Sequence, residues 1–260
     1  PVVVKPTDSS GGRGITIAKD KKELEFSIEL AKKFIVNNNR IIIEEFIDGT
    51  EVTVEGLACN GTIELLTLSD KIKPNSKYRV ATSLNYPANY SIETKQRIYD
   101  IVILAAESLG IANGAIHAEL IVSDDEMEIK IVELGARGGG GHVFGKIIQS
   151  VTGIDAPKEY VKLLLGKKPD LKVTFERGCV YRFFNPLHHG VLKSIEFDQK
   201  IFENDFVLDY GFTIKIGGRY EGLSNSLKRI GFLVVSGKDR ADAINNADFI
   251  EENILFDFKE

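Results

Sequence analysis

The sequence predicts an α+β protein built mainly on antiparallel strands. Two pairs of β-rich segments are separated by short turn sequences, which is typical of hairpins. Several longer segments space their apolar residues at three and four, which is typical of amphipathic helices. After Pro169 the strands become short and follow one another closely. We therefore expect three regions, at residues 1–46, 47–168 and 169–260.

The first region combines short strands with one helix. Strands are predicted at residues 2–5, 15–18 and 40–43, with a polar glycine-rich loop between the first two. Apolar residues at helical spacing predict a helix over residues 21–35. These are Leu24, Ile28, Ala31 and Ile35.

The second region is predicted to contain two hairpins and two helices. Its strands are expected at residues 51–58, 63–68, 115–122 and 127–134. Asn60-Gly61 is the turn signal of the first hairpin. Helices are expected at residues 93–109, ending near Gly110, and between Asp155 and Gly166. Residues 71–89 are polar and predict a loop.

The third region is predicted to be rich in strands and to end in a helix. Its strands are expected at residues 173–184, 190–197, 212–216 and 230–236. Ala243, Ala247 and Ile250 fall on one face of a helix over residues 239–253.

Composition excludes several classes of protein. Hydrophobic residues make up 43% of the 260 residues and charged residues 27%, which is typical of a globular chain. The net charge is 33 − 38 = −5, so we expect no nucleic acid and no membrane surface as partner. Two cysteines do not make a disulfide framework, and a reducing cytoplasm is expected. Pro1 opens directly into a strand, which favours a piece of a longer protein over a processed N-terminus.

The loop at residues 9–14 is the first candidate for binding chemistry. Successive glycines let backbone N–H groups converge on a phosphate, and Lys5 could neutralise its charge. Neither a P-loop nor a dinucleotide-binding pattern is present. A hairpin loop that uses glycine only for turn geometry is an equal alternative.

Two acidic segments are further candidates. Residues 44–51 could read a base edge through backbone groups around Glu45–Ile47, although solvated acids at a strand end explain them more simply. Glu119 and Glu133, on neighbouring strands, could hold Mg²⁺, which prefers oxygen ligands. Because side chains alternate along a strand, the two glutamates share a face only if the connecting loop has an odd length. Two surface acids are the alternative.

Four glycines follow Arg137. A run at residues 138–141 permits close approach of backbone to a ligand, and the Arg137 guanidinium offers a fork for phosphate or carboxylate. A flexible turn between strand and helix is the alternative.

In this order, the motifs resemble the ATP-grasp superfamily. Residues 2–6 and 9–14 resemble its lid subdomain, residues 43–51 its adenine-binding hinge, and residues 114–119 and 132–141 its magnesium segments. Residues 229–237, which lead into an alanine-rich helix, resemble the branch that contains biotin carboxylase, glycinamide ribonucleotide synthetase and L-amino-acid ligases. The resemblance implies an ATP-grasp fold, with a lid, an antiparallel-sheet core and a C-terminal β-rich subdomain.

The resemblance also implies site residues. Those expected to bind ATP are Lys5, Ser10, Gly11, Gly12, Glu44, Glu45, Phe46, Ile47, Glu51 and Lys71. Lys5 and Lys71 would contact phosphates, Glu44 the adenine amino group and Glu51 the ribose. Glu119 and Glu133 would hold Mg²⁺, and Arg137 would act as the catalytic residue on the transferred phosphoryl group.

Two departures from the family pattern stand out. The second glutamate is often followed, two residues on, by a metal-binding Asn, where this sequence has Gly135. The family's N-terminal domain, which usually shapes the acceptor site, has no counterpart in this sequence.

The implied activity is an ATP-dependent carboxylate–amine ligase that works through an acyl-phosphate. Its expected partners are a small-molecule carboxylate and an amine, an amino acid or small metabolite being favoured, and a homodimer is allowed. The alternatives are a phosphoribosylamine–glycine ligase, a biotin-carboxylase-like enzyme, a non-catalytic ATP-binding module, and a structural domain whose glycines only make turns.

Overall fold

The computed structural model describes residues 1–37, 40–74 and 80–259, and these fold into three sheets. The largest has eight strands in the order β11-β13-β9-β6-β5-β4-β7-β8, and the other two have the orders β2-β1-β3 and β12-β10-β14. All pairings between the described strands are antiparallel, which confirms the predicted α+β class. No helix in these ranges is long and apolar enough to cross a membrane.

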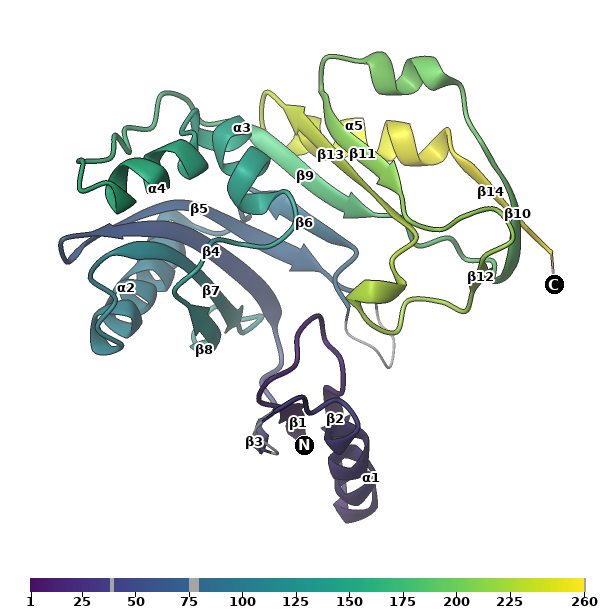
Figure 1. Ribbon diagram of the computed structural model, residues 1–260, viewed down its shortest axis with the longest axis horizontal. Helices are drawn as coiled ribbons and strands as arrows, with labels where there is room; N and C mark the ends of the chain where they lie inside the picture. The colour runs from purple at the N-terminus through teal and green to yellow at the C-terminus, as the bar shows by residue number, and fades with distance from the viewer. Residues whose placement is uncertain (38–39, 75–79, 260) are drawn as a thin grey trace.

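The N-terminal unit stands apart from the rest of the molecule in Figure 1. It consists of β1 (Val2–Pro6), β2 (Thr16–Ala18), α1 (Lys21–Lys32) and β3 (Ile41–Glu45). The Asp20 side chain caps α1 by accepting a hydrogen bond from the Glu23 N–H. Val4 and Ala31 are fully buried where α1 packs on β1, so Lys5, the next residue along β1, faces the other way. The sheet thus presents Lys5 to the rest of the molecule.

The central part of the large sheet holds the two predicted hairpins. Its elements are β4 (Thr50–Cys59), β5 (Thr62–Ile72), β6 (Ser83–Tyr86), α2 (Ile92–Ser108), β7 (Gly114–Val122) and β8 (Ile129–Gly135). Asn60 and Gly61 both have positive φ, 50° and 82°, which a tight hairpin turn requires. Val52, Val54 and Ala118 pack under α2, so the residues between them on β4 and β7 face the opposite side.

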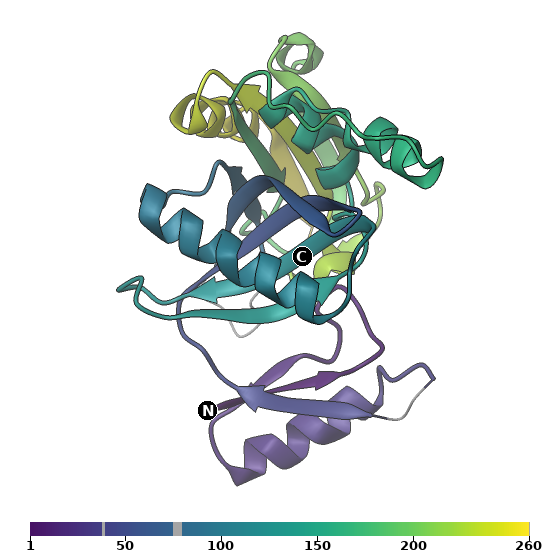
Figure 2. The same ribbon diagram turned by 90° about the vertical axis from the view of Figure 1, so that its left-hand side faces the viewer.

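Helices cover both faces of the large sheet, as Figure 2 shows. Opposite α2 lie a turn of π-helix (Val143–Ile147), α3 (Ile148–Thr152) and α4 (Ala156–Leu164). Asp155 caps α4 by accepting from the Lys158 N–H, as predicted. These helices cover only part of that face, and the remainder lies beneath the N-terminal unit.

The C-terminal residues form β9 (Gly178–Phe183), β10 (Gly190–Glu196), β11 (Val207–Phe212), β12 (Arg219–Tyr220), β13 (Gly231–Gly237), α5 (Arg240–Glu252) and β14 (Leu255–Lys259), with 3-10 turns at Gln199–Glu203 and Ser226–Lys228. Of these strands, β9, β11 and β13 complete the large sheet, whereas β10, β12 and β14 form a sheet of their own. The boundary expected at Pro169 lies between α4 and β9, and the sheet continues across it through the pairing of β6 with β9.

Several predicted elements were wrong. Residues 71–89 do not form one loop, because β5 continues to Ile72 and β6 pairs with β5 and β9 (residues 75–79 lie outside the described ranges). The polar residues of β6 bond to each other, Ser83 Oγ donating to Asn85 Oδ1 at 2.6 Å, so their polarity does not expose the strand.

Three errors concern the C-terminal strands. The strand expected at 212–216 is β11, which ends at Phe212 because the N–H groups of Thr213 and Ile214 both donate to the Ile230 carbonyl. The strand expected from residue 173 begins only at Gly178. The strand β14 was not predicted at all, since it pairs with β10 across some sixty residues of chain.

Candidate active site

A cavity of about 1280 Å³ lies between the N-terminal unit and the large sheet. It is lined by all thirteen residues that the sequence analysis singled out, which are Lys5, Ser10, Gly11, Gly12, Glu44, Glu45, Phe46, Ile47, Glu51, Lys71, Glu119, Glu133 and Arg137. These residues come from strands β1, β3, β4, β5, β7 and β8 and from the segments that follow β1, β3 and β8. The fold therefore brings the predicted residues together, while their individual roles remain predictions.

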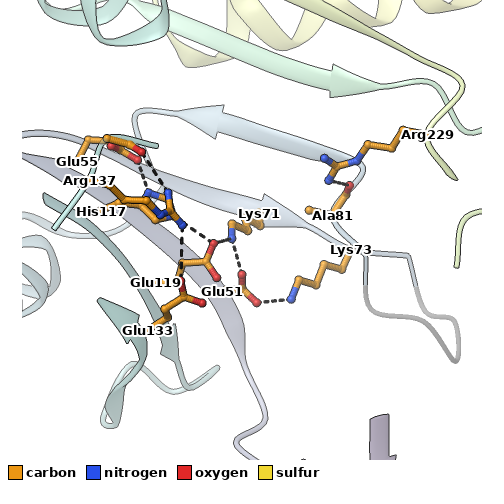
Figure 3. Close-up of polar contacts among 11 residues, drawn as sticks. Glu51, Glu55, Lys71, Lys73, Ala81, His117, Glu119, Glu133, Arg137 and Arg229 are labelled. Atoms are coloured by element: carbon orange, nitrogen blue, oxygen red, sulfur yellow. Dashed lines mark hydrogen bonds and ion pairs between the residues drawn. The ribbon is translucent and has the colours of Figure 1, made fainter. Parts of the chain in front are cut away.

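The floor of the cavity is a cluster of charged side chains from three adjacent strands, shown in Figure 3. Its members are Glu51 and Glu55 of β4, Lys71 of β5 with Lys73 just beyond the end of that strand, and His117 and Glu119 of β7. On β4 and β7 the members alternate with the core residues Val52, Val54 and Ala118, which is how a polar set can be presented on one face of a buried sheet.

Lys71 is the centre of this floor. Its Nζ donates to Glu51 Oε1 at 2.5 Å and to Glu119 Oε1 at 2.6 Å. Burial lowers the pKa of Lys71, but the charges of Glu51 and Glu119 outweigh burial and the net pKa is raised. Lys73 forms an ion pair with Glu51. Lys71 is thus held charged between two carboxylates.

His117 is held between two glutamates. Its Nδ1 lies 2.5 Å from Glu55 Oε1, and its Nε2 lies 3.5 Å from Glu119 Oε1. Burial lowers the pKa of His117, yet hydrogen bonding to Glu119 and Glu55 raises it to about 9, so the ring is protonated at neutral pH. Burial would raise the pKa of Glu119, but hydrogen bonding to His117 and the charge of Lys71 lower it well below its usual range.

The glycine run at 138–141 packs directly on this floor. The Gly139 N–H donates to Glu55 Oε2 at 2.8 Å, and a Cβ on Gly139 would lie 2.2 Å from Glu55 Oε1. A Cβ on Gly140 would meet nothing within 4 Å. Gly139 is therefore required for close approach to Glu55, which is a structural reason for glycine at this position.

Glu119 and Glu133 lie directly opposite each other on β7 and β8. The condition set by the sequence analysis was wrong, because the connection between the paired residues Val122 and Ile129 holds six residues, an even number. Glu119 pairs with Glu133, but the next residue, Leu120, pairs with Ile131, so Val132 is an extra, bulged residue of β8. This bulge shifts the pairing of the two strands by one residue. The two carboxylates therefore share a face in spite of the even loop.

This pair fits a Mg²⁺ ion that is also bound by a nucleotide. Within the described ranges, no three or more His, Cys, Asp and Glu side chains are grouped so as to hold a metal. Two carboxylates suffice where phosphate oxygens and waters complete the coordination of Mg²⁺. Gly135 offers no side-chain ligand, and a Cβ there would lie 3.4 Å from Arg137 Cγ. Arg137 itself is half exposed, with Nη2 at 3.6 Å from Glu133 Oε1.

The glycine loop of the N-terminal unit reaches the C-terminal part of the chain. The Gly11 carbonyl accepts from the Ser226 N–H at 3.1 Å and from Ser226 Oγ at 3.0 Å. Figure 1 shows this loop extending toward the large sheet. At the base of the loop, Lys5 forms an ion pair with Glu44 of β3. The loop thus covers the cavity while docked on the 3-10 turn at Ser226–Lys228.

Several cavity or floor residues were missed from the sequence. Glu55 could have been found, because it lies four residues from Glu51 on the same strand. Lys73 lies two residues beyond Lys71, just past the end of β5. Arg229, whose side chain lines the cavity, carries no such signal because it lies outside any strand.

Asp70, next to Lys71, turns away from the cavity. Its two carboxylate oxygens accept hydrogen bonds from Arg240 Nη1 at 2.6 Å and Nη2 at 2.8 Å, and Arg240 belongs to α5.

Comparison with known families identifies the chain. Residues 1–145 match the family described as ATP-grasp domain, which is more than half of the chain. The chain belongs to the ATP-grasp family. Residues 182–259 match a second family, described as L-amino acid ligase C-terminal domain 2. The resemblance and the ATP-grasp fold expected from the motifs are thereby confirmed.

Curated relatives match only part of this ATP-grasp chain. A D-alanine--D-alanine ligase from Flavobacterium johnsoniae is 33% identical over 132 residues, 48% of this chain and 40% of that protein. Dapdiamide A synthase from Enterobacter agglomerans is 31% identical over 150 residues, 54% of this chain and 34% of that protein. The matched part is therefore less than half the length of these relatives.

Solved structures share the whole fold. An L-amino acid ligase from Bacillus licheniformis superimposes with a TM-score of 0.82 at 23% identity, covering 100% of this chain and 64% of that one. A phosphoribosylglycinamide synthetase from Anaerococcus prevotii superimposes with a TM-score of 0.73 at 22% identity, and the match covers 100% of this chain and 64% of that one. The biotin carboxylase domain of 2-oxoglutarate carboxylase from Hydrogenobacter thermophilus was solved with MgADP and bicarbonate. It superimposes with a TM-score of 0.71 at 17% identity, and the match covers 99% of this chain and 57% of that one. At these identities the likeness establishes the fold.

Proposed function

We propose that this chain is the ATP-binding and catalytic part of a carboxylate–amine ligase that works through an acyl-phosphate. The observation that carries the proposal is the cavity itself, which gathers Lys71, Arg137 and the paired Glu119 and Glu133 beneath a glycine loop. Bound ATP with Mg²⁺ would supply the phosphoryl group that turns a carboxylate into an acyl-phosphate. Such chemistry needs positioning and charge neutralisation more than a nucleophile from the protein.

The residues divide this work by position. Lys5 and Lys71 would neutralise phosphate charge from opposite sides of the cavity, since one belongs to the N-terminal sheet and the other to the floor. Glu119 and Glu133 would hold the metal on one strand face. Arg137, half exposed beside them, would stabilise charge on the transferred group. The loop docked on Ser226 would keep water from the labile intermediate.

An amino acid or similar small metabolite is the substrate class that we favour. Support comes from residues 182–259, which match the L-amino acid ligase C-terminal family, and from relatives described as D-alanine--D-alanine ligase and dapdiamide A synthase. We rank a phosphoribosylamine–glycine ligase and a biotin-carboxylase-like enzyme lower, because the corresponding structures share only the fold.

Hydroxylamine trapping tests the proposal. The full-length protein is incubated with ATP, Mg²⁺ and a panel of carboxylic acids, and an acyl-phosphate is captured as its hydroxamate while phosphate is released. We expect hydroxamate with at least one amino acid. We expect Glu133→Gln to reduce its formation at least about a hundredfold through lost metal binding, in the range seen when charge stabilisation is removed.

Glu128→Gln is the matched control, because Glu128 is exposed on the same hairpin outside the cavity. It should leave hydroxamate formation unchanged. ATP binding without hydroxamate from any acid would contradict the proposal and favour a non-catalytic nucleotide-binding module.

A further inference from the structure

Arg229 is a cation on the side of the cavity away from the metal-binding pair. It lies between the 3-10 turn at Ser226–Lys228 and β13, and Figure 3 shows it on the far side of Lys71 from Glu133 and Arg137. Together with the apolar residues around it, it forms what we call the far wall. The far wall consists of Ala81, Leu84, Val143, Tyr181, Phe183 and Arg229.

The Arg229 guanidinium contacts a backbone carbonyl and an aromatic ring. Its Nη2 donates to the Ala81 carbonyl at 2.9 Å, and its central carbon lies 3.4 Å from the centroid of the Phe183 ring. Its Nε is buried and has no hydrogen-bond partner among the described residues. Stacking on an aromatic ring orients the planar fork and supplies modest cation–π attraction.

No carboxylate of the described chain pairs with Arg229. Burial lowers the pKa of Arg229 to about 10, so the group is still charged at neutral pH. A partly buried cation without a counter-charge is costly, and proteins usually compensate it with an anion. The cations of the floor, by contrast, each have a carboxylate partner.

The surroundings of Arg229 suit an amphipathic ligand. Leu84, Val143 and Phe183 belong to one apolar cluster that lines the cavity, and the Phe183 ring lies directly against the guanidinium. An anion bound there would be separated from Glu119 and Glu133 by the floor lysines. A metal-bound phosphate would be drawn instead to those lysines and, through its metal ion, to the glutamates, so the far wall favours a carboxylate attached to an apolar group.

We infer that Arg229 binds the unreacted α-carboxylate of an amino acid that serves as the amine substrate, with its apolar side chain on the far wall. This inference rests on the proposed ligase function. In that reaction the amine nitrogen attacks the acyl carbon, phosphate leaves with the bonding pair, and the nitrogen loses a proton. The α-carboxylate of the amine substrate is unchanged and becomes the free carboxyl end of the product, so it needs a cation that the reaction does not consume.

The test compares amino acids with their carboxamides in the full-length protein. Phosphate release is measured with a panel of the standard amino acids as amine substrates, and with the carboxamide of the best one. We expect the unsubstituted protein to prefer the free amino acid to its carboxamide. Arg229→Met should remove this preference by raising the KM of the free amino acid about 10–100-fold, which is the effect of losing a hydrogen bond between charged groups. The KM of the carboxamide should hardly move, and Arg229→Lys should restore part of the preference.

Arg177→Met is the matched control, because Arg177 also lies over an aromatic ring, that of Phe175, but outside the cavity. It should leave both KM values unchanged. An equal effect of Arg229→Met on acid and carboxamide, or none on the acid, would overturn the inference.

A calorimetric titration separates this inference from the proposed function. The best amino acid of the panel, or each amino acid if none supports turnover, is titrated into the protein saturated with ADP and Mg²⁺. If the protein shows no turnover but binds an amino acid, and Arg229→Met abolishes this binding, the carboxylate site stands and only the proposed ligase function is overturned. Absence of both turnover and binding would overturn both.

Discussion

On the floor of the cavity, Lys71 lies between two carboxylates at 2.5 and 2.6 Å, whereas on the far wall Arg229 contacts a carbonyl oxygen and an aromatic ring and, among the described residues, pairs with no carboxylate. Both cations are largely removed from water. The floor neutralises its own charges, so removing one member leaves others uncompensated. The far wall leaves a charge free for a ligand. The floor cation is therefore held by carboxylates of the chain itself, whereas the far-wall cation has no such carboxylate among the described residues.

The largest expected effect is on the floor. Lys71→Met should lower the free energy of unfolding by about 3–5 kcal/mol, because Glu51 and Glu119 then lose the buried cation that they share and keep only Lys73 and His117 beside them. Urea unfolding of the full-length protein measures this. Lys73→Met is the matched comparison, since Lys73 pairs with Glu51 alone and should cost clearly less. Equal losses in the two variants would refute the central role of Lys71.

The next effect tests the packing of the glycine run on the floor. Gly139→Ala should lower the free energy of unfolding by about 1–3 kcal/mol, the usual cost of overpacking, because its Cβ would overlap Glu55. Gly140→Ala, with open space around the Cβ, should change it little. Thermal unfolding of the pair provides the measurement. If Gly140→Ala proved the more harmful, the close approach to Glu55 would not be what requires glycine in this run.

A smaller effect is expected where the N-terminal loop meets the C-terminal turn. Gly11 and Gly12 both have positive φ, 68° and 75°, so alanine strains both. Only at Gly11 would the Cβ meet a neighbour, 2.3 Å from Ser226 Oγ, which must turn away and lose its hydrogen bond. Loss of one hydrogen bond should raise the KM for ATP about fivefold more in Gly11→Ala than in Gly12→Ala. Identical KM values would mean that docking on Ser226 does not contribute to ATP use.

The smallest effect is expected on the far wall. Arg229→Met should change the free energy of unfolding by less than about 1 kcal/mol, because no carboxylate loses its partner. Urea unfolding beside Lys71→Met makes the comparison direct. A loss as large as that of Lys71→Met would show that Arg229 holds the wall together through Phe183 and Ala81, and the contrast between the two regions would disappear.

Much of the floor could be predicted because it depends on short-range rules. Side chains alternate along a strand, so Glu51 and Glu119, which lie in predicted strands, could be placed on strand faces. Lys71 lay in a predicted loop, and the family resemblance alone singled it out. The turn at Asn60-Gly61 and the cap at Asp155 are likewise local, since each depends on the residue's own backbone preferences or on an atom three residues away.

The sequence by itself therefore determined the strand-rich α+β class, the hairpins, the helix caps and thirteen of the residues that line the cavity. Only the tertiary structure decided how these parts meet. The bulge at Val132, which sets Glu119 opposite Glu133, depends on pairing between two strands. The position of β6 depends on partners in β5 and β9, and the exposure of Arg229 to the cavity depends on packing against Phe183. These contacts join residues far apart in the chain, and local periodicity carries no information about such distances.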